Sequence, residues 1–157
     1  MTRHDTQTIQ IDTDPSQVVR FLGDGANLAR WAIGFAVAVR PRGDQWVVTT
    51  HSGAEVDTRV LTDDFAGTVD FVMTPAPGVT ATAWTRVVPV ADGSLLSFTQ
   101  VQQPGMPDEI FDAQVSAVTH ELAALRAMLE VQCPLFDEKP AIYLAPLSVL
   151  GRMRRPR

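Results

Sequence analysis

The order of the predicted elements constrains this chain more than any single motif. An alternating strand at residues 6–12 precedes two short helical segments, six strands joined by tight turns, and one long amphipathic helix at residues 108–130. Strands that follow one another through short turns pair as an antiparallel meander. Because such a sheet must cover one apolar face, the long helix is the element expected to cover it. The order therefore predicts an α+β domain in which a hollow can form between helix and sheet.

The helices are indicated by their first residues and by their apolar spacing. Asp14 supplies an N-cap carboxylate, Pro15 suits the first helical position, and Gln17 lies three residues after the cap. A second short helix is expected at residues 26–32. In the long helix, apolar residues recur at spacings of three and four and predict one stripe against the sheet: Phe111, Val115, Val118, Leu122, Leu125 and Leu129.

The six later strands are expected at residues 35–40, 45–50, 54–61, 66–73, 80–88 and 94–103. In the first four, one predicted face is apolar: Phe35, Val37, Val39, Trp46, Val48, Ala54, Val56, Val60, Val69, Phe71 and Met73. The opposite face is mostly polar: Gln45, Thr49, Glu55, Asp57, Arg59, Thr68 and Asp70. This alternation is typical of a sheet with one face in water.

The last two strands have two open registers. If the loop at residues 75–78 holds four residues, the inner face carries Thr82, Trp84, Arg86, Ser97, Thr99 and Val101. A one-residue bulge would instead turn inward Ala83, Val87, Leu96 and Phe98.

Length and composition favour one globular domain. At 157 residues with 45% hydrophobic residues, the chain can bury a core, and we predict a single ligand-binding domain at 1–133 with a partly apolar, basic-ended tail at 134–157. The net charge of −5 disfavours nucleic-acid binding. No apolar run is long enough to span a membrane, and the lone Cys133 fits a reducing compartment, so we expect a cytoplasmic location.

This order of elements resembles the helix-grip fold of the START-like, Bet v 1-like (SRPBCC) superfamily, in particular its bacterial polyketide cyclase/dehydrase-like branch. The resemblance covers residues 6–130 and is carried by segment 14–22, Asn27-Leu28-Ala29-Arg30-Trp31-Ala32, Arg86-Val87-Val88-Pro89 and Pro104-Gly105-Met106-Pro107. It implies a seven-stranded curved antiparallel sheet wrapped around the C-terminal helix, with two short helices after the first strand. Because the superfamily ranges from lipid carriers through hormone receptors to cyclases, the resemblance implies an apolar cavity more firmly than a reaction.

The candidate ligand-binding residues are mostly aromatic or apolar: Trp31, Trp46, Phe71, Met73, Trp84 and Arg86. If Arg86 points inward, it requires an acceptor, which could be a protein carboxylate or a carboxylate or keto oxygen of a ligand. Under the other register, Arg86 is exposed. The sequence contains no Gly-rich phosphate loop, no nucleophile elbow and no His or Cys pair at metal spacing, so no cofactor and no metal are expected.

The sequence does not establish any catalytic residue, and its candidates are Arg86 and His51. His51 lies in a predicted turn, where it is either solvated or close enough to a cavity to move a proton near neutral pH. Asp57 and Asp70 are expected opposite one another on the outer face, in water and moderated by Arg59. If these two carboxylates were buried, one of them would hold a proton.

The leading functional prediction is the binding of a small hydrophobic or aromatic molecule, polyketide-like or lipid-like, in the cavity. One alternative is an aromatase/cyclase-type enzyme in the same cavity, in which His51 or Arg86 assists enolisation and water loss. Another is an interaction protein without a cavity ligand. The tail also carries an apolar cluster that predicts a twofold homodimer: Ile142, Leu144, Leu147, Val149 and Leu150.

Overall fold

The computed structural model describes residues 1–131. Its elements are β1 (His4–Ile11), α1 (Pro15–Gly23), η1 (Gly25–Asn27), α2 (Leu28–Trp31), β2 (Ala38–Arg42), β3 (Gln45–Thr49), β4 (Glu55–Asp63), β5 (Thr68–Ala76), β6 (Val79–Val90), β7 (Gly93–Val101) and α3 (Asp108–Val131). The predicted α+β order is confirmed. Cys133, the tail at 134–157 and its predicted dimer contact lie outside the described residues. No helix within residues 1–131 is long and apolar enough to cross a membrane.

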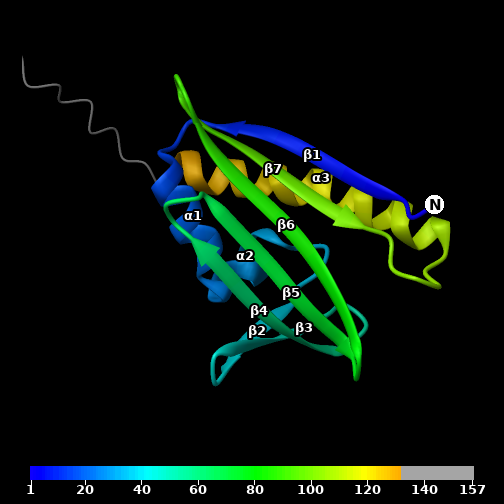
Figure 1. Ribbon diagram of the computed structural model, residues 1–157. Helices are drawn as coiled ribbons and strands as arrows, with labels where there is room; N and C mark the ends of the chain where they lie inside the picture. Colours follow the sequence, from blue (N-terminus) through cyan, green and yellow to red (C-terminus); the bar gives the residue numbers. More distant parts are fainter. Residues whose placement is uncertain (132–157) are drawn as a thin grey trace, which may run out of the picture.

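The strands form one seven-stranded antiparallel sheet in the order β1-β7-β6-β5-β4-β3-β2. Successive hairpins connect β2 to β7, and β7 lies beside β1, the first strand of the chain, and pairs with it. Figure 1 shows α3 running along β1 and β7, with α1 and α2 on the same side of the sheet. This is the helix-grip arrangement predicted from the sequence.

Local sequence signals account for where the helices begin. The Asp14 side chain accepts a hydrogen bond from the backbone N–H of Ser16 at 2.9 Å, and Pro15 occupies the first helical position of α1. Asp108 and Glu109 lie in the first turn of α3, where the helix dipole favours acidic groups. The stripe of α3 is buried in the core through Phe111, Val118, Leu122, Leu125 and Leu129.

The prediction of an apolar inner face holds for the middle of the sheet. Val48, Val56, Val69 and Phe71 are buried. The prediction was wrong at Val37, which is 55% exposed, because the first strand of the meander begins only at Ala38. Phe35 and Ala54 also lie outside the strands, Phe35 in the turn after α2 and Ala54 just before β4.

The structure selects the second of the two registers for β6 and β7. Pairing between β5 and β6 shifts by one residue between Met73 and Ala76. Because side chains alternate along a strand, this shift turns every later residue of β6 to the opposite face. Ala83, Val87, Leu96 and Phe98 are therefore buried, whereas Trp84 and Arg86 lie on the outer face of the sheet.

The expected pairing of two carboxylates across β4 and β5 was wrong. Asp57 lies opposite Thr74, and Asp70 lies opposite Leu61, because the two strands extend to a turn that contains Gly67. Gly67 has φ 66°, and a Cβ there would lie 2.2 Å from the carbonyl oxygen of Val87, so only glycine fits.

Both carboxylates nevertheless share the outer face, as predicted. Asp57 pairs with Arg42, and Asp70 pairs with Arg86, whose Nη1 donates to Asp70 Oδ1 at 2.6 Å. The arginines that moderate the two charges are therefore Arg42 and Arg86, and not Arg59 as expected.

Candidate functional site

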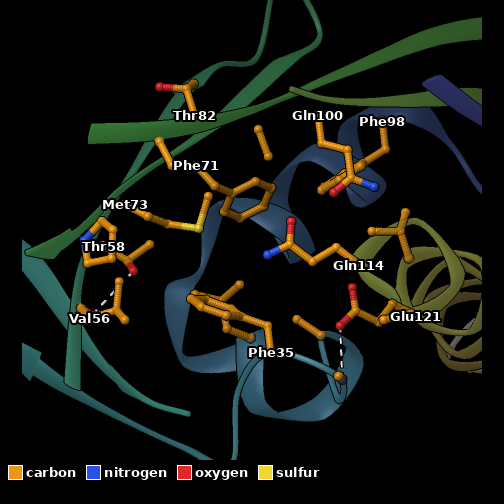
Figure 2. A pocket seen from close by; sticks show the side chains of 18 of the residues that line it. Phe35, Val56, Thr58, Phe71, Met73, Thr82, Phe98, Gln100, Gln114 and Glu121 are labelled. Atoms are coloured by element: carbon orange, nitrogen blue, oxygen red, sulfur yellow. Dashed lines mark hydrogen bonds between the residues drawn. The ribbon is translucent and has the colours of Figure 1, made fainter. Parts of the chain in front are cut away.

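A cavity of about 310 Å3 lies between α3, the segment around α2, and strands β4 to β7. Figure 2 shows its lining side chains converging from the sheet and from α3. Most of its wall is carbon, contributed by large side chains: Trp31, Phe35, Val56, Phe71, Met73 and Phe98. Such a wall favours contact with apolar ligand atoms.

The cavity exists because small residues occupy positions from which larger side chains would fill it. On β6 the two inward residues that line the cavity are Ala81 and Ala83, and on α3 the facing residue is Ala117. Ala32 and Gly34, at the end of α2, are equally small. Protein interiors are otherwise packed with few voids larger than a water molecule, so this set of small residues decides where the hollow lies.

Among the residues of 1–131 that line the cavity, Glu121 on α3 is the one with an ionisable side chain. It is 5% exposed, and its Oε1 accepts a hydrogen bond from the backbone N–H of Gly34 at 2.9 Å (Figure 2). Burial raises the pKa of Glu121, and the backbone amides of Gly34 and Phe35 partly offset that rise. The site therefore favours the neutral carboxylic acid more than water does.

Gly34 allows the close approach that this hydrogen bond requires. A Cβ at this position would lie 2.9 Å from Glu121 Oε1 and 2.9 Å from the Cβ of Ala117. Since real Cβ atoms essentially never come so close, any larger residue at position 34 would displace α3 or the Glu121 carboxyl.

Amide and indole groups supply the other polar features of the wall. Gln100 on β7 and Gln114 on α3 both direct their amides into the hollow (Figure 2). Trp31 Nε1 and Gln100 Nε2 are buried and have no hydrogen-bond partner within residues 1–131. The indole of Trp31 lies 5.7 Å from the ring of Phe71, measured between centroids, with a tilted geometry.

Three of the six residues predicted to bind a ligand line the cavity: Trp31, Phe71 and Met73. Trp46 does not line it and packs against Gly25, where an added Cβ would lie 2.4 Å from the indole. Trp84 and Arg86 lie on the outer face for the register reason given above.

The two sequence candidates for catalysis do not reach the cavity. Arg86 is bound to Asp70 on the outer face. His51 is exposed, and its Nε2 lies 2.7 Å from the carbonyl oxygen of Ile33, to which it donates. Neither residue is part of the cavity lining. Within residues 1–131, no three His, Cys, Asp or Glu side chains gather closely enough to hold a metal ion.

The sequence analysis missed Glu121, Gln100 and Gln114, although a signal was present for the first two. Glu121 lies three residues after Val118 and four before Leu125, which places it on the apolar stripe of α3. Gln100 continues the inward alternation of Leu96 and Phe98 along β7. A polar residue at a position that the apolar period assigns to the interior is the feature that could have identified both.

Comparison with known proteins places the chain by sequence and by shape. A family model described as "Polyketide cyclase / dehydrase and lipid transport" matches residues 3–130. A comparison with curated protein sequences found no match.

Solved structures with similar folds include the protein XoxI from Bacillus cereus, with a TM-score of 0.65 and 17% identity over 80% of this chain and 94% of that one. The di-domain ARO/CYC BexL from the BE-7585A biosynthetic pathway has a TM-score of 0.66 and 21% identity over 84% of this chain and 48% of that one. A START superfamily protein from Mycobacterium smegmatis has a TM-score of 0.58 and 12% identity over 82% and 98%. These likenesses support the helix-grip fold.

Proposed function

The chain belongs to the polyketide cyclase/dehydrase and lipid transport family, and we propose that it binds a small, largely apolar molecule in the cavity between α3 and the sheet. The observation that carries this proposal is the hollow of about 310 Å3 with an aromatic and aliphatic wall inside an otherwise packed domain. A hollow of this size costs packing contacts unless a ligand occupies it.

The size of the cavity limits the ligand to a compact molecule. Ligand pockets generally span roughly 300–1,000 Å3, and this one lies at the lower end. Burying a few hundred square ångströms of apolar surface at ~25 cal/mol per Å2 contributes several kcal/mol. After the costs of association, that contribution supports micromolar affinity for a ligand of two or three fused rings or a short acyl chain.

A neutral fluorescent probe, N-phenyl-1-naphthylamine, tests the proposal directly. The probe should bind the wild-type protein with enhanced fluorescence. Ala81→Phe adds a ring at an inward position of β6 and should weaken binding at least about tenfold, because it fills the hollow. Thr80→Phe, at the adjacent exposed position outside the lining, is the matched control and should bind normally.

Absence of probe binding, or equal binding by the two variants, would contradict a cavity site. Native mass spectrometry of protein purified from its own host adds an independent measurement, since a bound molecule should appear as a stoichiometric added mass. A partner protein captured without any such mass, together with no probe binding, would favour an interaction protein.

A second candidate function is a cyclase-type reaction in the same cavity, and Glu121 is the observation that favours it. Ring closure of a poly-β-ketone followed by loss of water requires a proton on the departing hydroxyl group. The buried carboxyl of Glu121 is suited to donate that proton and, as the carboxylate, to take up the α-hydrogen that leaves with the water, whereas Arg86 and His51 lie outside the cavity. BexL, to which the fold is similar, is described as an ARO/CYC protein. Formation of a dehydrated cyclic product from a short poly-β-keto thioester, lost in Glu121→Gln, would favour the enzyme.

A further inference from the structure

Two buried N–H groups of the cavity wall have no acceptor within residues 1–131. Trp31 Nε1 and Gln100 Nε2 are both inaccessible to solvent and have no hydrogen-bond partner within residues 1–131. An indole N–H can only donate, so Trp31 requires an acceptor whatever the orientation of neighbouring amides. Because a buried donor without an acceptor is unfavourable, a ligand oxygen that reaches these groups gains affinity.

The part of the cavity wall formed by residues 1–131 has no cationic side chain to neutralise a ligand carboxylate. Its described lining residues include no Lys, Arg or His, and Arg86 is directed to the outer face, where it binds Asp70. A carboxylate placed in the hollow would lose its water without gaining a cation. It would also lie in the same cavity as the carboxyl group of Glu121, so this wall disfavours anionic ligands such as free fatty acids.

Glu121 has one oxygen engaged by the protein and one available to a ligand. The backbone N–H of Gly34 donates to Oε1, and Figure 2 shows the other oxygen directed away from Gly34, on the side of Gln114. Burial favours the protonated acid. In that form Glu121 adds an O–H donor to the two N–H donors described above.

An amine ligand would suit only part of this arrangement. An ammonium group could pair with an ionised Glu121, but it carries donors alone and would leave Trp31 Nε1 and Gln100 Nε2 without an acceptor. A neutral oxygen acceptor can receive a hydrogen bond from either donor and introduces no buried charge.

We propose, on the basis of the ligand-binding function proposed above, that the cavity selects an uncharged molecule bearing a ketone or ester carbonyl, which accepts a hydrogen bond from Trp31 Nε1 or Gln100 Nε2, and that it rejects carboxylates and amines. The apolar wall binds the hydrocarbon part of the molecule, and the hydrogen-bond donors determine which functional group is preferred.

Four naphthalenes of similar shape test this selection by displacement of N-phenyl-1-naphthylamine at pH 7. They are 2-acetylnaphthalene, 2-ethylnaphthalene, 2-naphthoate and the ammonium form of 2-naphthylmethylamine. The ketone should bind about tenfold more tightly than the hydrocarbon, which is the scale of one or two buried hydrogen bonds. The naphthoate should bind at least about a hundredfold more weakly than the ketone, because its charge is buried without a partner.

Substitutions of the donors separate recognition from packing. Trp31→Phe removes the indole N–H and retains a ring beside Phe71, while Gln100→Leu removes the amide. Each should reduce the ratio of ketone affinity to hydrocarbon affinity, measured in the same variant, to about threefold or less. Trp84→Phe, on the outer face, is the matched control and should keep the full preference. Retained binding of the hydrocarbon shows that each variant is folded.

The outcomes distinguish this inference from the function on which it rests. If the probe and the hydrocarbon bind but the ketone has no advantage, or if the naphthoate or the amine binds best, the inference is overturned and the cavity site stands. If none of the five compounds binds, the proposed ligand-binding function fails, and the inference fails with it.

Discussion

Acidic side chains have opposite environments on the outer and inner faces of this domain. On the outer face, Asp70 pairs with Arg86, and the two side chains are 27% and 44% exposed. On the inner side, Glu121 is 5% exposed, and its hydrogen bond comes from the backbone of Gly34 rather than from a cation. Water and arginine compensate charge on one face, while desolvation without a cation favours a neutral acid on the other. The comparison teaches that the same kind of side chain, a carboxylic acid, is stabilised as the anion on one side of the sheet and as the neutral acid on the other.

The largest expected difference between the faces is in hydrophobic burial. Leu125 is fully buried on the inner side, whereas Leu95 on the outer face is 37% exposed. Leu125→Ala, like Leu122→Ala, should lower the free energy of unfolding by ~2–5 kcal/mol, because it deletes buried methyl groups and leaves a void. Leu95→Ala should cost less than about 1 kcal/mol. Urea denaturation measures both, and equal losses would contradict the assignment of faces.

The effect of Glu121→Gln on the free energy of unfolding should depend on pH, unlike that of a substitution on the outer face. The folded-state pKa of Glu121 lies above its ordinary value of 4.5 because burial disfavours the charge. The native state therefore holds this proton more tightly than the unfolded state does. Stability falls as the pH rises from the pKa of the unfolded state to the higher pKa of the folded state. The neutral, isosteric variant should be more stable than wild type by on the order of 1 kcal/mol at pH 8 and should lose this advantage near pH 4.

Thermal unfolding of wild type and Glu121→Gln across this pH range gives the comparison. Glu55→Gln, on the outer face beside Arg40, is the control and should show no such gain at high pH. A difference between wild type and Glu121→Gln that does not change with pH would mean that Glu121 ionises as freely in the folded protein as in the unfolded chain.

The smallest effect is expected for the ion pair of Asp70 and Arg86. A double-mutant cycle with Asp70→Asn and Arg86→Ala should give a coupling energy below about 1 kcal/mol, because the pair is partly solvated. High salt should weaken it further. Probe binding should be unchanged in Arg86→Ala, and a large loss of affinity in that variant would place Arg86 in contact with the ligand.

The order of elements and the apolar side of the central strands could be predicted from the sequence. Val48, Val56, Val69 and Phe71 are buried as expected, because alternation with period two depends only on neighbouring residues. The same alternation placed Phe71 and Met73 on the inner face, and the resemblance to helix-grip proteins implied the cavity that these two residues and Trp31 line. Local reasoning also explains the start of α1, where Asp14 and its neighbours form a cap within a few residues.

Only the tertiary structure decided which side of β6 faces inward and which polar groups reach the cavity. The one-residue shift between Met73 and Ala76 reverses Trp84 and Arg86, and no local pattern distinguishes a bulge from a longer loop. Glu121 becomes buried because α3 packs against Gly34, a residue 87 positions away in the chain. Periodicity is a property of adjacent residues, whereas burial and the partners of a polar group depend on segments that meet only after the chain has folded.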